Sequence, residues 1–144
     1  MWSIISTDGV LQEVRTMLKP NMNDVDNRQN RKRVLTQAVI KASGIMNLRQ
    51  AVIAKTLGIS ESSVSRMKSG DYLLKDTGKE WELAALLVRL YRSLDAIMAG
   101  DKDSLRAWLL NYNTALSEAP INLISNVAGL AKTVDYVDSY RARV

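Results

Sequence analysis

The side chains that carry most enzyme chemistry are missing from this sequence. Its 144 residues include no Cys and no His, which excludes a thiolate nucleophile, an imidazole base and a soft-ligand zinc site. Only carboxylate pairs remain, namely Asp101 with Asp103 and Asp135 with Asp138. Each pair is explained more simply by helix caps and solvated charges. We therefore expect no enzyme, no metal and no cofactor.

Charge is distributed unevenly along the chain. Residues 1–79 hold 13 Lys and Arg against 7 Asp and Glu, a net charge of +6, whereas residues 80–144 hold 7 against 8, a net charge of −1. The densest basic run is RQNRKR at residues 28–33. Clustered cations on phosphates release counterions, so a nucleic acid would meet the N-terminal half. A solvated basic surface is the alternative.

Apolar residues recur at helical spacing through most of the chain. No alternating run is long enough for a sheet, so the predicted fold class is all-α. The expected helices cover residues 10–19, 31–44, 48–57, 60–69, 79–99, 103–112, 121–126 and 133–140. No segment approaches the roughly 20 apolar residues of a membrane span. We expect a cytoplasmic protein with no membrane partner.

The helices suggest four regions. An N-terminal helix and a polar linker, residues 20–27, make up residues 1–27. Two short helices lie in residues 28–78, a long connecting helix in 79–100, and a small helical domain in 101–144.

Several residues have the spacing of helix ends. Gly44 is expected as a left-handed C-terminal cap, and Asp101 as an N-terminal cap. Thr77 and Glu80 have the spacing of a capping box, and Pro120 suits the first turn of a helix. These residues therefore predict where four of the helices begin or end.

Residues 50–69 match the spacing of a DNA-binding helix-turn-helix. Ala54 is the small residue that lets the second helix approach, Gly58 can take positive φ in the turn, and Ser60 is the expected N-cap. The positions that must be buried are filled by Ile53, Leu57, Ile59, Val64 and Met67. An ordinary pair of antiparallel helices is the alternative.

With Val64 and Met67 inside, the helix period turns the other face of the second helix outward, toward a major groove. Arg66 can bind guanine through two N–H groups, and Glu61 can accept from cytosine. The serine hydroxyls suit base edges or phosphates, and the remaining polar side chains suit phosphates. The predicted DNA-binding residues are Gln50, Lys55, Ser60, Glu61, Ser62, Ser63, Ser65, Arg66 and Lys68. Solvated side chains on a charged helix are the alternative.

Residues 46–67 resemble the Xre and phage-repressor class of helix-turn-helix, with some likeness to phage CII-type activators. The class includes repressors, activators and antitoxins. Residues 94–144 resemble the toxin-binding C-terminal domain of the Xre/MbcA/ParS antitoxin family. That likeness is carried by Ala107-Trp108-Leu109, residues 111–113, Leu116, residues 120–124, Gly129 and residues 134–140.

The resemblance implies a toxin partner and operator DNA. Such antitoxins block a toxin encoded beside them, often a RES-domain enzyme that consumes NAD or an ADP-ribosyltransferase-like relative, and they repress their own operon. In some members the C-terminal end enters the toxin's active site. The implied toxin-binding residues are Trp108, Tyr112, Asn113, Tyr140, Arg141, Arg143 and Val144. Core packing of the aromatic residues and fraying of the tail are the alternatives.

A second function stays open, namely a phage-type transcriptional regulator whose C-terminal helices only oligomerise. A neighbouring reading frame for a small toxin would favour the antitoxin. In either case we expect a homodimer, because operators are commonly palindromic. The helix at residues 79–99 carries more apolar residues than one face needs, so it is either central to the fold or shared between subunits.

Overall fold

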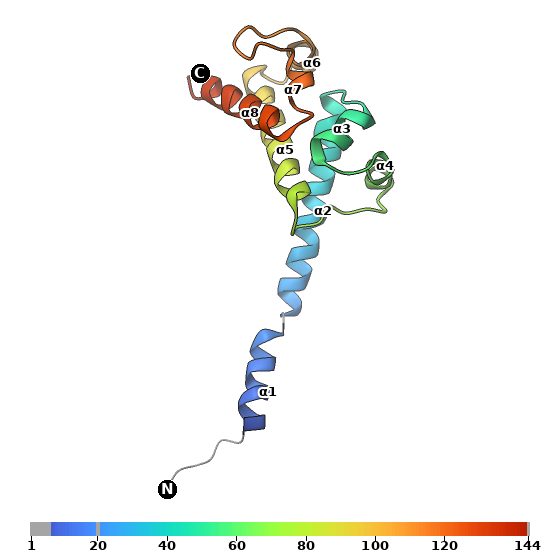
Figure 1. Cartoon of the computed structure of the whole chain (residues 1–144), viewed down its shortest axis with the longest axis vertical. Helices are drawn as coiled ribbons and strands as arrows, with labels where there is room; N and C mark the ends of the chain where they lie inside the picture. The colour runs from blue at the N-terminus through green and yellow to red at the C-terminus, as the bar shows by residue number, and fades with distance from the viewer. Residues whose placement is uncertain (1–6, 20, 144) are drawn as a thin grey trace. The chain divides into compact units, whose positions relative to one another are not determined.

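The computed structural model describes residues 7–19 and 21–143 (Figure 1). Within those residues it is helical, with one isolated β-bridge between Asn113 and Glu118 and no strand, so the all-α prediction is confirmed. The helices are α1 (Thr7–Leu18), α2 (Met22–Ile45), α3 (Gln50–Leu57), α4 (Glu61–Ser69), α5 (Lys79–Ile97), α6 (Lys102–Leu110), α7 (Pro120–Leu123) and α8 (Val127–Arg141). None of these described helices is both long and apolar enough to cross a bilayer.

The chain divides between Arg31 and Lys32 into two units. The first contains α1, on which Val10, Leu11 and Val14 recur at helical spacing and are each between 43% and 48% exposed. The second unit contains the buried core and all the helices from α3 onward.

The predicted linker is wrong between residues 22 and 27, because α2 already begins at Met22. Asn21 caps this helix: its carbonyl oxygen accepts from the N–H of Asp24 at 2.9 Å, and its side-chain oxygen accepts from the N–H of Asn23 at 3.3 Å. Short polar side chains favour turns and helix N-termini for the same reason, namely that they bond nearby backbone groups. The polar stretch therefore starts a helix.

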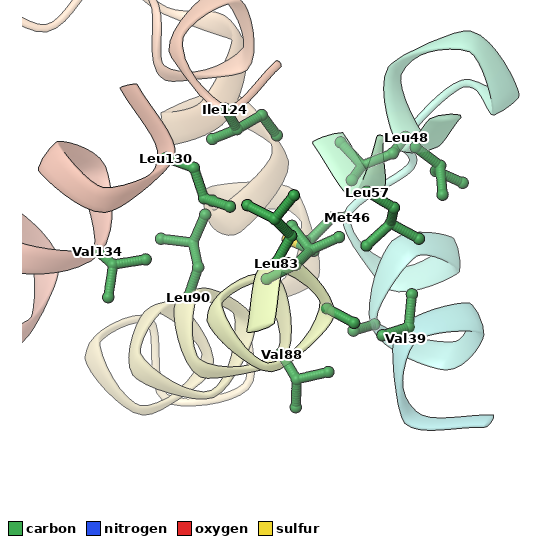
Figure 2. Packing of buried hydrophobic residues seen from close by; sticks show 14 of the residues in the cluster. Val39, Met46, Leu48, Leu57, Leu83, Val88, Leu90, Ile124, Leu130 and Val134 are labelled. Atoms are coloured by element: carbon green, nitrogen blue, oxygen red, sulfur yellow. The ribbon is translucent and has the colours of Figure 1, made fainter. Parts of the chain in front are cut away.

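Helix α5 is central to the second unit. It lies between α8 on one side and α2 and α3 on the other (Figure 2). Leu87, Leu90 and Leu94 are at most 1% exposed, and burying each such side chain contributes about 1.5–3 kcal/mol. The surplus of apolar residues at 79–99 thus serves the chain's own core.

Two of the predicted helix ends are wrong. Gly44 lies inside α2, and the left-handed residue is Asn47, with φ 56°, a conformation that Asn tolerates better than most residues. Helix α5 begins after Gly78 without a side-chain cap. The carboxylate of Glu80 accepts instead from the hydroxyl of Tyr72 at 2.8 Å, so the capping box with Thr77 does not form.

The predicted starts of α6 and α7 are confirmed, whereas α8 starts elsewhere than predicted. Asp101 caps α6 by accepting from the N–H of Asp103 and of Ser104, and the hydrogen bond from the Ser104 hydroxyl is the main cause that lowers the pKa of Asp101. Pro120 is the first residue of α7. Helix α8 begins six residues earlier than predicted, because the side chain of Asn126 accepts from the N–H of Gly129 at 2.7 Å.

Polar contacts tie the C-terminal helices to the rest of the unit. The Nε of Arg106 on α6 donates to the carbonyl oxygen of Ile45 at 2.8 Å, at the end of α2. On α8, Asp138 accepts from the hydroxyl of Ser93 at 2.9 Å and pairs with Arg89, both on α5. These contacts join α6 to the end of α2, and α8 to α5.

Gly129 generates a prediction about stability. A Cβ at this position would lie 2.1 Å from the carbonyl oxygen of Leu123, where α8 crosses the end of α7. Gly129→Ala should therefore lower the free energy of unfolding in urea by about 1–3 kcal/mol. The control is Gly44→Ala inside α2, where a Cβ meets nothing within 4 Å. This substitution should raise the free energy of unfolding by about 0.5–1 kcal/mol, because alanine favours a helix more than glycine does. Equal effects of the two substitutions would contradict the close approach.

Candidate nucleic-acid interface and C-terminal pocket

Helices α3 and α4 pack as the helix-turn-helix spacing predicts. Ile53, Leu57, Val64 and Met67 are at most 3% exposed. The turn residue Gly58 has φ 69° and donates its N–H to the carbonyl oxygen of Ala54, which ends α3. Ala54 is buried as well, and Ile59 packs partly buried against the same core. The interior of the motif is therefore confirmed.

Ser60 begins α4 as predicted. Its hydroxyl oxygen accepts from the N–H of Ser63 at 3.1 Å, which satisfies one of the free amides at the helix start. The same oxygen lies 3.0 Å from the hydroxyl of Ser62 and 2.9 Å from that of Ser63. A small network of serine hydroxyls thus occupies the N-terminal turn of α4.

Most of the predicted DNA-binding side chains lie exposed on α3, the turn and α4. The exposed ones are Lys55, Ser60, Glu61, Ser62, Ser65, Arg66 and Lys68. Ser63 is only 8% exposed, and Gln50 is half-buried with its Nε2 donating to the carbonyl oxygen of Glu61 at 2.7 Å. The positions of Ser63 and Gln50 favour a structural role over a DNA contact.

Arg66 has two neighbours within its own chain. Its Nη2 donates to the hydroxyl oxygen of Ser63 at 3.3 Å, and its guanidinium carbon lies 5.5 Å from the centre of the Tyr72 ring. Burial, followed by the hydrogen bond to Glu80, raises the pKa of Tyr72 to about 12. Sequence reasoning missed Tyr72, because the ring reaches Arg66 only after the chain reverses at Gly70.

The loop after α4 is anchored on α2. The buried hydroxyl of Thr36 accepts from the N–H of Leu74 at 3.0 Å and donates to the carbonyl oxygen of Lys32 at 2.7 Å. Lys32 also pairs with Asp76 at 3.7 Å. Lys41 of α2 and Lys68 of α4 line one shallow pocket nearby. Cations from two helices therefore gather at the C-terminal end of α4.

A second candidate site is an apolar pocket of about 330 Å³ between α5, α6 and α8. Trp108 and Tyr140, both predicted from the sequence, lie on its wall. The remaining lining residues are Leu94, Ile97, Met98, Tyr136 and Val137. Tyr136 was missed, since one aromatic residue on a helix gives no signal of a pocket by itself.

Tyr112, Asn113, Arg141 and Arg143 do not line this pocket. Tyr112 is 67% exposed. Asn113 holds a turn, because its side-chain oxygen accepts from the N–H of Leu116 at 3.1 Å. Arg141 is exposed with its Nη1 3.4 Å from the hydroxyl of Ser93, Arg143 is exposed, and Val144 lies outside the described residues.

Comparison with protein families assigns both parts of the chain. Residues 26–89 match the antitoxin Xre-like helix-turn-helix domain, and residues 93–143 match the antitoxin Xre/MbcA/ParS C-terminal toxin-binding domain. The chain belongs to the Xre-type antitoxins, with a helix-turn-helix followed by a toxin-binding domain. A search among curated proteins gave no match.

The family match agrees with the geometry. The exposed face of α4 lies in the helix-turn-helix domain, which implies DNA binding, and all residues of the apolar pocket lie in the domain that implies a toxin partner. These families are not known as enzymes.

Ser60 provides a test of the local structure of α4. Ser60→Ala removes the acceptor for the N–H of Ser63 and should cost about 1 kcal/mol of unfolding free energy. Ser65→Ala, on the exposed face of the same helix, should change stability by less than about 0.5 kcal/mol. Urea unfolding of both variants measures the difference, and an unchanged Ser60→Ala midpoint would refute the capping role.

Proposed function

We propose that this antitoxin neutralises a toxin encoded beside it and represses its own operon through the helix-turn-helix. The observation that carries the proposal is that two sites lie on different helices of one folded unit. A cationic face is carried by α3 and α4, and an apolar pocket lies between α5, α6 and α8. The family match supports a DNA partner for the first and a toxin for the second.

For DNA, the N-terminal end of α4 enters the major groove. Arg66 binds guanine through two N–H groups, Glu61 accepts from a cytosine amino group, and Ser62 faces a neighbouring base edge or a phosphate. Lys68 binds phosphate together with Lys41, which lines the same shallow pocket. The excess positive charge of residues 32–79, with 9 Lys and Arg against 3 Asp and Glu, supports this part of the second unit as the one that meets DNA.

Arg66 and Lys68 distinguish base recognition from phosphate binding. Arg66→Ala should cost about 1–3 kcal/mol on the operator and relax the sequence preference. Lys68→Ala should weaken binding to all duplexes and flatten the dependence of log affinity on log salt. Affinities are measured by fluorescence anisotropy at several salt concentrations. Equal operator affinity of the wild type and Arg66→Ala at fixed salt would refute the base contact.

For the toxin, we propose that the apolar pocket receives an apolar side chain of the partner, with Trp108 and Tyr140 as the main contacts. Tyr140 is 51% exposed at the wall of the pocket, so it is reachable from solvent. Buried aromatic residues dominate the energetics of many interfaces. We further propose that the toxin is a RES-type or ADP-ribosyltransferase-like enzyme, and that Arg141 and Arg143 oppose the groove that holds the phosphates of its dinucleotide.

Coexpression with the product of the neighbouring reading frame tests this part. The wild type should rescue growth and form a stable complex, and Tyr140→Ala should weaken the complex by about 2 kcal/mol or more. Leu110→Ala is the control, because Leu110 is 66% exposed in the same domain and outside the pocket. Equal losses from the two substitutions would remove the pocket from the interface. No rescue by the wild type would favour a regulator without a toxin.

We also propose that the protein binds its operator as a homodimer, since a palindromic site offers two half-sites about one helical turn apart. Leu83, Leu87, Leu90 and Leu94 of α5 are buried in the chain's own core, so only the partly buried residues of this helix, Trp81, Leu86, Tyr91 and Ile97, could contribute to the interface. Light scattering of the complex with operator DNA checks this, and the mass of one chain per duplex would contradict it.

A further inference from the structure

We propose that Tyr72 is a positioning residue that holds Arg66 in the orientation needed to recognise a base. The inference rests on the proposed role of α4 in DNA binding. It assigns a function to a residue outside the helix-turn-helix, in the loop that follows α4.

The guanidinium of Arg66 is held at two points. Its carbon lies 5.5 Å from the centre of the Tyr72 ring, and its Nη2 donates to the hydroxyl oxygen of Ser63 at 3.3 Å. Ser63 lies one turn before Arg66 on α4, so the side chain is turned toward the N-terminal end of the helix. That end is the one that enters the major groove in this class of motif.

The contact with the Tyr72 ring is a cation–π contact and does not involve a hydrogen-bond acceptor. A guanidinium has five N–H donors in its plane. Ser63 takes one of these donors. The remaining donors include the pairs with which an arginine binds the two acceptors of guanine.

Tyr72 is itself fixed by contacts that do not involve Arg66. Its hydroxyl donates to the carboxylate of Glu80 at 2.8 Å, at the start of α5. Two residues later, the N–H of Leu74 donates to the buried hydroxyl of Thr36 on α2. The phenol is protonated at neutral pH, as an ordinary tyrosine is, and burial raises the pKa of Tyr72 further, so this donor persists. The ring is therefore a rigid platform.

A side chain that is already held in one orientation loses less conformational entropy when it binds DNA. The fixed ring therefore lowers the entropic cost of the contact between Arg66 and a base. The benefit applies to the contact that Arg66 makes with a base. Phosphate contacts by other side chains are unaffected, so loss of the ring should reduce discrimination between sequences more than it reduces non-specific binding.

The test is a double-mutant cycle between Tyr72 and Arg66. The DNA is a duplex selected from a random pool by the wild-type protein, compared with single-base variants of that duplex at fixed salt. Tyr72→Leu should weaken binding to the selected duplex about two- to fivefold and reduce discrimination at one guanine. In an Arg66→Ala background, Tyr72→Leu should cause no further loss.

Two further variants sharpen the test. Tyr72→Phe keeps the ring but loses the hydroxyl that bonds Glu80, so its discrimination should fall between those of the wild type and Tyr72→Leu. Leu73→Ala changes the adjacent residue of the same loop, which is 38% exposed, and should leave binding unchanged.

The outcomes separate this inference from the proposed function. If Arg66→Ala leaves affinity and discrimination unchanged, the base contact itself is refuted. If Arg66→Ala is costly but Tyr72→Leu has no effect, or an equal effect in both backgrounds, only the positioning role is overturned. NMR gives a second measurement on the wild type: side-chain protons of Arg66 should show a ring-current shift that Tyr72→Leu removes. Absence of that shift in the wild type would also overturn the positioning role.

Discussion

Burial of α5 from two sides is the constraint on which both candidate sites depend. Its leucines pack against α2 and α3 on one side and against α8 on the other (Figure 2). The start of α5 supplies Glu80, which holds Tyr72 beside α4, and its end supplies Leu94 and Ile97 to the apolar pocket. One helix therefore sets the positions of the proposed DNA-binding face and the proposed toxin-binding pocket.

Polar contacts refine this arrangement. Arg106 bonds the last turn of α2, and Asp138 joins α8 to α5 through Ser93 and Arg89. Such bonds are directional, whereas burial of apolar surface is not. Hydrophobic burial thus brings the helices together. A few polar contacts between segments distant in sequence then determine the orientation of the helices relative to one another.

The interior of the helix-turn-helix was predictable from the sequence, because the turn at Gly58 and the buried face of α4 follow from local spacing. The start of α2 was not, since Asn21 suits a turn and a helix cap equally well. Nor was Tyr72, whose position depends on the bond between Thr36 and Leu74, 38 residues apart. The pocket at Trp108 and Tyr140 likewise needs three helices to meet. Pairings at such separations leave no periodic signal in one sequence.

Amide hydrogen exchange can show whether DNA and toxin bind different helices of one folded unit. The full chain is compared alone, with its selected duplex, and with the product of the neighbouring reading frame. We expect DNA to slow exchange in α3 and α4, and the toxin to slow it in α6, α8 and the end of α5. Toxin-dependent protection confined to α3 and α4 would contradict separate binding sites, as would DNA-dependent protection confined to α6 and α8.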